Sequence, residues 1–205
     1  MLIKILIIIW PLLVTTFALS YRKKQNGANA LTGGPISMPK SFWLAYTVST
    51  WFFFPLIFVT HPDVDMGIKI ILIFHLISWW IRGSLELVMI YKWFNWSPRY
   101  GISHDFFHLA GILTLLWKYG LPGQVSLPSF LAAVFIAVTI FATMAELLFA
   151  YLFLQFRSKE EADDNIYFAS DDPKWIFINR VTLSVVCAVM GHLIWQSFYV
   201  LVSMP

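Results

Sequence analysis

The sequence predicts an all-α fold, a polytopic helical bundle that lies in a membrane. Of the 205 residues, 59% are hydrophobic, 18% are aromatic and 12% are charged. An ordinary soluble domain has about 45–50% apolar and about 25% charged residues, so this chain has too few charges to cover a water-exposed surface. The composition excludes a soluble globular domain, a disordered chain and a nucleic-acid-binding domain. Membrane lipids are the expected surroundings, and nucleic acid is not an expected partner.

Six apolar segments come close to the length that a bilayer demands. A helix needs about 20 apolar residues to cross a hydrocarbon core of about 30 Å. We expect transmembrane helices at residues 2–20, 41–60, 67–91, 103–120, 129–156 and 174–202. Because backbone polar groups must be satisfied within lipid, these segments are expected to form one helical domain over residues 1–205.

The first expected helix and the two longest connectors are consistent with a single helical domain. The first helix, MLIKILIIIWPLLVTTFALS, also resembles a secretory signal peptide, because an early lysine precedes an apolar run that ends in small residues. We interpret it as an anchored helix with a kink at Pro11. The longest connector, 21–40, is polar and contains glycine and proline, and the next longest, 157–173, is acidic. Neither is large enough for a soluble domain.

Lysine and arginine residues predict the orientation of the bundle. With six crossings, nine of them fall on one side of the membrane: Arg22, Lys23, Lys24, Lys40, Lys92, Arg99, Arg157, Lys159 and Lys174. Only Lys4, Lys69 and Lys118 mark the other side. Cytoplasmic loops carry the excess of positive charge, so the odd-numbered loops are expected in the cytoplasm and both termini on the non-cytoplasmic side.

Ionisable side chains inside the expected helices are the candidates for function, because charge in the bilayer core is costly. In 67–91 they follow one helical stripe with a tryptophan: His75, Trp79, Arg82 and Glu86. The later helices carry His104, Asp105, His108, Glu146, Arg180 and His192. With a rise of about 1.5 Å per residue, all except His75 and His192 fall in the cytoplasmic half. The sequence thus predicts a rich inner polar level and an outer histidine pair.

The inner level predicts a metal site or a proton relay. His104 and His108 are one helical turn apart, so both rings point the same way, as metal ligation requires. With Glu86 and Glu146 they would form a set of imidazole and carboxylate ligands, which suits zinc or iron. Without a metal, the same histidines would transfer protons.

These residues predict a membrane enzyme that acts on a lipid-like substrate. The expected catalytic acids and bases are Glu86, Glu146 and Asp105. An anionic head-group would be held by Arg82, Arg180 and Arg99.

An alternative is that the inner charges only neutralise one another. Arg82 would then pair with Glu86 one turn away, and Arg180 would pair with Glu146 or Asp105. Such pairs fix the register of neighbouring helices without performing chemistry.

Two short resemblances concern the histidines. HDFFH at 104–108 resembles the first histidine box of membrane fatty-acid desaturases, which implies a di-iron centre with further boxes, but the chain has five histidines and no second box. Three histidines that include an H-x3-H pair also resemble the ceramidase and adiponectin-receptor group of membrane hydrolases. There a third histidine joins the pair, whereas the expected depth of His75 keeps it apart from His104 and His108.

Two further functions remain open. His75 and His192, at similar depth on different helices, would supply both axial ligands of haem b in an electron-transfer subunit. Nineteen phenylalanines and ten tryptophans also offer the packing surface of a non-enzymatic subunit in a larger membrane complex.

Overall fold

All regular secondary structure in the described part of the chain is helical. The computed structural model describes residues 53–91, 97–120 and 126–157, with Ile9, Thr16 and single positions from 173 to 195. Its elements are α3 (Phe54–Thr60), α4 (Met66–Tyr91), α5 (Pro98–Tyr119) and α6 (Leu127–Arg157). The expected helices at 2–20 and 174–202, and most of the one at 41–60, lie outside this description. The all-α prediction is confirmed for the described elements.

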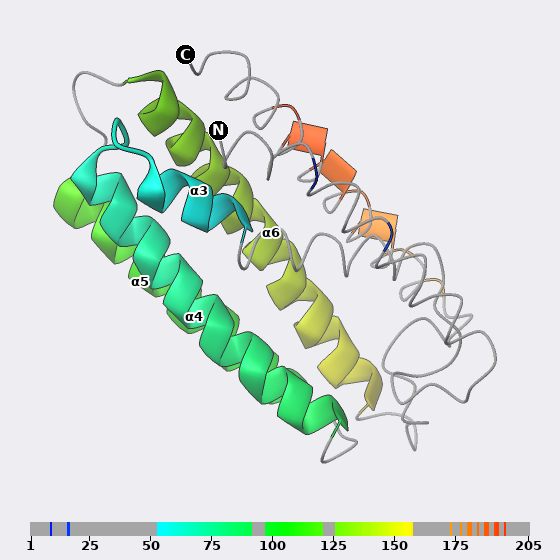
Figure 1. Ribbon diagram of the computed structural model, residues 1–205. Coiled ribbons are helices and arrows are strands. Elements are labelled where there is room, and N and C mark those ends of the chain that lie inside the picture. The colour runs from blue at the N-terminus through cyan, green and yellow to red at the C-terminus, as the bar shows by residue number, and fades with distance from the viewer. Residues whose placement is uncertain are drawn as a thin grey trace.

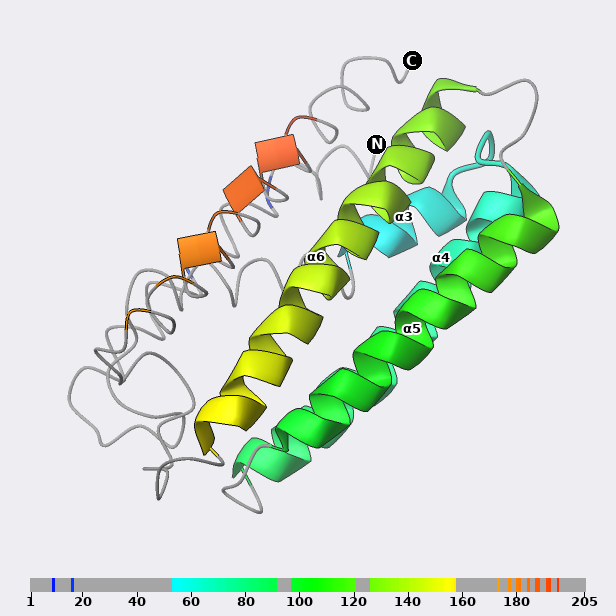
Figure 2. The same cartoon turned by 180° about the vertical axis from the view of Figure 1, so that it is seen from behind.

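Three long helices lie side by side, and one short helix contacts them at one end. Figures 1 and 2 show α4, α5 and α6 as long neighbouring rods, with α3 packed near the start of α4. Residue contacts join α5 to both α4 and α6, and α3 touches α4 and α6. Side chains from three helices can therefore meet between the rods.

Local capping explains where α4 and α5 begin. The carboxylate of Asp65 accepts hydrogen bonds from the backbone N–H groups of Gly67 (2.7 Å) and Ile68 (3.3 Å), as an N-cap residue does. At α5, the Ser97 hydroxyl accepts from the Tyr100 N–H, and Pro98 occupies the first turn, where its missing N–H costs nothing. These caps fix the start of each helix and therefore the register of its side chains.

The opposite end of α5 and the start of α6 are also fixed. Gly120 ends α5 with φ of 66°, a left-handed conformation that glycine adopts without steric cost. The hydroxyls of Ser126 (2.6 Å) and Ser129 (3.1 Å) both donate to the carbonyl of Asp63. The Asp65 N–H donates to the Ser129 hydroxyl at 2.8 Å, so the loop before α4 is bound directly to α6.

Apolar and polar residues divide the buried interior along α4. Ile68, Ile71 and Leu72, in its first turns, are buried in the apolar core with phenylalanines of α3 and with Phe135 of α6. The buried residues that follow along the helix are largely polar: His75, Ser78, Trp79, Arg82 and Glu86. The apolar half joins α3, α4 and α6, and the polar half carries the candidate site.

The outward-facing surfaces of the three long helices are apolar. The most exposed large hydrophobic residues include Ile77 and Ile81 on α4, Phe106 and Trp117 on α5, and Phe141 on α6. Two stretches, Met66–Glu86 and Leu127–Leu152, are long and apolar enough to cross a membrane. Polar side chains inside and apolar ones outside reverse the usual arrangement of a soluble protein.

Replacing Gly111 by alanine is expected to lower the free energy of unfolding. A Cβ atom at position 111 would overlap the tip of the Phe74 ring, which contacts the rings of Phe107 and His108. Overpacking costs about 1–3 kcal/mol, which exceeds the helix propensity of about 1 kcal/mol that alanine gains over glycine. Thermal unfolding in detergent micelles measures the change.

Gly191→Ala is the matched control, because no atom of the residues that the structure describes lies within 4 Å of its Cβ position. Alanine should leave stability at this helical position unchanged or raise it. Equal losses in the two variants would contradict the close packing of α4 against α5 at Gly111.

Candidate functional site

One guanidinium group joins three helices at the polar half of the bundle. Arg82 Nε donates to Glu86 Oε1 at 3.0 Å, within α4. Its Nη1 donates to Asp105 Oδ1 of α5 and to Glu146 Oε2 of α6, the latter at 2.9 Å. Arg82 is 4% exposed and Asp105 is fully buried. We call these four residues the Arg82 cluster.

The Arg82 cluster contains more acid than base. Three carboxyl groups share one guanidinium, so full ionisation would leave two negative charges without a matching cation inside the cluster. Among the described residues, the second carboxylate oxygen of Asp105, Oδ2, is buried without a hydrogen-bond partner. Buried charge without compensation is costly, so protons or another cation must reduce this excess.

Histidines extend the Arg82 cluster along α4 and α5. His104 Nδ1 is 3.4 Å from Asp105 Oδ1, and His104 Nε2 is 3.0 Å from both the hydroxyl and the carbonyl oxygen of Ser78. The Ser78 hydroxyl is 3.2 Å from His108 Nδ1. His108 Nε2 is in turn 3.2 Å from His75 Nδ1. The contacts form one continuous chain from Arg82 to His75.

The Ser78 carbonyl and Asp105 can both accept hydrogen bonds from His104 only when the His104–Asp105 pair carries an additional proton. The Ser78 carbonyl can only accept, so we place a hydrogen on His104 Nε2. An ionised Asp105 also only accepts, so the contact with His104 Nδ1 needs a second hydrogen. With both hydrogen bonds formed, either His104 is an imidazolium or Asp105 is protonated. The pair then holds one proton beyond those of a neutral imidazole and a carboxylate.

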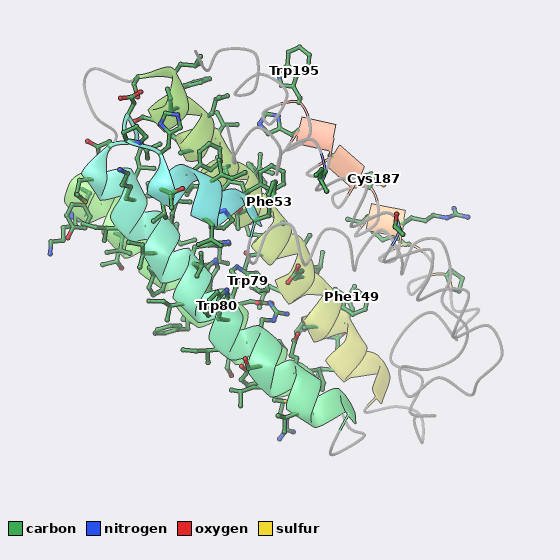
Figure 3. All side chains as sticks on the ribbon, in the orientation of Figure 1. Phe53, Trp79, Trp80, Phe149, Cys187 and Trp195 are labelled. Atoms are coloured by element: carbon green, nitrogen blue, oxygen red, sulfur yellow. The ribbon has the colours of Figure 1, made fainter. Side chains whose placement is uncertain are left out.

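Trp79 fixes the hydrogen positions of His108. Its indole Nε1–H donates to His108 Nε2 at 3.2 Å, and because indole only donates, this nitrogen of His108 must accept. A neutral His108 then carries its hydrogen on Nδ1 and donates to the Ser78 hydroxyl. Trp79 is 1% exposed, whereas its neighbour Trp80 is 45% exposed; Figure 3 labels both side chains on α4.

The structure brings most of the predicted inner residues together. Arg82, Glu86, Asp105 and Glu146 form the cluster, and His104 and His108 adjoin it. Of the two ion pairs considered for the inner level, Arg82–Glu86 is present. Arg99 and Arg180 are exposed, and the acids expected to pair with Arg180 instead bind Arg82.

The predicted metal ligands have other partners here. Glu86 and Glu146 both accept hydrogen bonds from Arg82, and His104 and His108 both contact Ser78. Within the residues that the structure describes, no group of three histidine, cysteine or acidic side chains could hold a metal ion. Zinc or iron at these residues stays a prediction.

The expected separation of His75 from the inner histidines was wrong. His75 Nδ1 contacts His108 Nε2, and the ring centroids are 5.1 Å apart. The reason is that α5 begins at Pro98 rather than at residue 103, which carries His108 about 8 Å deeper into the bundle than the sequence suggested. Haem ligation by His75 and His192 stays a prediction.

Ser78 was missed as a site residue. Its hydroxyl contacts both His104 and His108, and its side chain is buried. The sequence did carry a signal, because Ser78 lies three residues after His75 and four before Arg82, on the same helical stripe. A serine on an apolar helix usually bonds its own backbone, as Thr139 and Thr143 do on α6.

No family model, no curated protein and no solved structure matches the chain. The function proposed for the chain therefore rests on the geometry of the site.

Replacing Arg82 by methionine is expected to destabilise the protein by about 3–5 kcal/mol, because it leaves buried acids without their cation. Arg99→Met, at an exposed position, should change stability by less than about 1 kcal/mol. Unfolding of both variants in detergent gives the comparison.

The double variant Arg82→Met/Glu146→Gln separates charge from packing. Removing one acid should restore part of the stability lost in Arg82→Met, since coupled sites are not additive. Strictly additive losses would show that Arg82 stabilises the bundle by packing rather than by compensating the carboxylates.

Proposed function

We propose that this is a multi-pass membrane protein whose Arg82 cluster is an acid–base site that takes up and releases protons within the bilayer. The two membrane-length stretches, in α4 and α6, support the membrane location. The exposed apolar face of α5, which includes Phe106, Phe107 and Trp117, supports it as a further span. The remaining spans and the non-cytoplasmic placement of both termini belong to the same proposal.

The observation that carries the acid–base proposal is the sharing of one buried guanidinium by three carboxyl groups. Two surplus negative charges would be costly in a low-dielectric interior. Two protons remove this cost. We place one of them on His104 or Asp105, where it allows both contacts of His104 to be hydrogen bonds. The second belongs on Glu86 or Glu146.

The role of Arg82 that its contacts support is charge compensation. Its Nε and Nη1 donate to protein carboxylates, so binding of an anionic head-group would have to compete with these acids. Arg99 and Arg180 are exposed and stand apart from these contacts. We therefore propose proton exchange, rather than lipid binding, as the function of the Arg82 cluster.

Infrared spectroscopy of the protein in lipid bilayers tests this proposal. At neutral pH the wild type should show the carbonyl stretch of a protonated carboxylic acid, and Glu146→Gln should remove or shift this band. The expected loss is roughly one carboxylic acid per chain, because the proposal places one proton on the Glu86 and Glu146 pair.

Asp63→Asn is the control for the infrared experiment, because Asp63 is exposed at the opposite end of α4. It should leave the band unchanged. A wild-type spectrum without any protonated carboxylic acid at neutral pH would overturn the acid–base proposal.

Metal and haem predictions have their own tests. Elemental analysis of the purified protein would reveal zinc or iron, and His108→Ala should then abolish the stoichiometric metal. An absorption spectrum would reveal haem through its Soret band, with His75→Ala as the matched variant. A stoichiometric metal that is lost in His108→Ala would show that the site is a metal centre rather than an acid–base site.

A subunit role is the remaining alternative. Affinity purification from the native membrane distinguishes it, because a constitutive complex would co-purify in fixed stoichiometry. A solitary protein that retains the carboxylic acid band would favour the acid–base proposal.

A further inference from the structure

We infer that the histidines form a proton-transfer path from the Arg82 cluster to His75, and that the indole N–H of Trp79 holds this path closed. This inference rests on the proposed acid–base function and adds a path and a gate to it. Arg82, Ser78 and His75 mark the course of the path along α4. From Glu86 to His75 the path covers about 16 Å of helix, roughly half of a hydrocarbon core.

Ser78 is the link between the two halves of the path. Its hydroxyl lies 3.0 Å from His104 Nε2 and 3.2 Å from His108 Nδ1. These two imidazole rings, whose centroids are 6.0 Å apart, share no direct hydrogen bond in the described part of the structure. A hydroxyl can accept one hydrogen while it donates another. Proton transfer between His104 and His108 therefore passes through Ser78.

The observed hydrogen bonds close the path at this hydroxyl. The carbonyl of Ser78 requires a hydrogen on His104 Nε2, and the indole of Trp79 requires one on His108 Nδ1. The Ser78 hydroxyl then faces an N–H group on each side and can only accept from both. No lone pair of His108 is available to receive a proton from it.

Release of Trp79 opens the path. His108 can then carry its hydrogen on Nε2, which leaves a lone pair on Nδ1. In one transfer, His104 Nε2 gives its proton to the Ser78 oxygen, and the Ser78 hydroxyl hydrogen passes to His108 Nδ1. The Nε2 hydrogen of His108 passes to His75 Nδ1. One proton leaves His104, one arrives at His75, and Ser78 and His108 each gain one and lose one.

The Trp79 ring, which forms the gate, is in contact with the guanidinium group of Arg82. The guanidinium carbon of Arg82 lies 4.6 Å from the centre of the Trp79 ring, a cation–π arrangement. Among the described residues, the ionisable groups facing this region are His75, Arg82 and Glu86 on α4, Tyr100, His104, Asp105 and His108 on α5, and Glu146 on α6. A change in their protonation that moves Arg82 would also move Trp79.

Hydrogen exchange of the imidazole N–H groups, followed by ¹⁵N solid-state NMR of the full chain in lipid bilayers, tests the gate. In the wild type, His104 should exchange with solvent faster than His108 and His75, and His108 should show the Nδ1–H tautomer. Trp79→Phe should convert His108 partly to the Nε2–H tautomer. It should also speed exchange at His108 and His75 by about fivefold, the factor that one neutral hydrogen bond represents.

Three further variants keep the test decisive. Benzothienylalanine at position 79 keeps the shape of the indole ring without its N–H, and it should act like phenylalanine even if Trp79→Phe fails to fold. Adding Ser78→Ala to either variant should return exchange at His75 to the slow rate and leave exchange at His104 unchanged. Trp80→Phe, on the exposed side of α4, is the matched control and should have no effect.

The outcomes separate the gate from the acid–base site. Exchange at His75 that ignores both the loss of the indole N–H and the loss of the Ser78 hydroxyl would overturn the path, even with the infrared band of the cluster intact. Absence of that infrared band from the wild-type protein would overturn the acid–base site, whatever the tautomer of His108.

Discussion

The arrangement of the polar half depends on the contacts of Arg82 with acids from its own helix and from two others. A guanidinium presents donors in a fixed planar fork, so Glu86, Asp105 and Glu146 can all bind only when α4, α5 and α6 have one rotation and one register. Turning α5 by a single residue, about 100°, would move Asp105 away from Arg82 and toward the apolar outer face. The ion pairs thus specify the bundle more than they stabilise it, since burying charge is itself costly.

The apolar half allows this costly arrangement to persist. Phe54 and Phe58 of α3 lie with their ring centroids 6.3 Å and 5.9 Å from that of Phe135 of α6, and they belong to the same core as Ile68 and Leu72 of α4. Ser126 and Ser129 bind the loop before α4 at the same end. Helices held together at one end by packing and hydrogen bonds can position ionisable groups further along.

The sequence predicted which residues form the site better than it predicted the contacts between them. Helical spacing placed His75, Arg82 and Glu86 on one stripe and predicted the Arg82–Glu86 pair, because both depend on a single helix. Contacts between helices depend on where each helix begins and how closely the backbones approach. The start of α5 at Pro98 and the lack of a side chain at Gly111 set its register against α4, and neither can be converted into distances from the sequence alone. That is why His75 was assigned to the wrong level.

Two groups that cannot titrate set the hydrogen positions of the closed histidine network. The Ser78 carbonyl never donates and the Trp79 indole never accepts at physiological pH, so they set the hydrogens of His104 and His108 as long as both contacts are kept. A chain built from imidazoles and carboxylates alone would have no such fixed hydrogen positions. Here both groups come from adjacent residues of α4, and both act on histidines of α5. A small displacement between these two helices would therefore change the donor pattern at both histidines together, which is how a packed interface can switch a buried proton path.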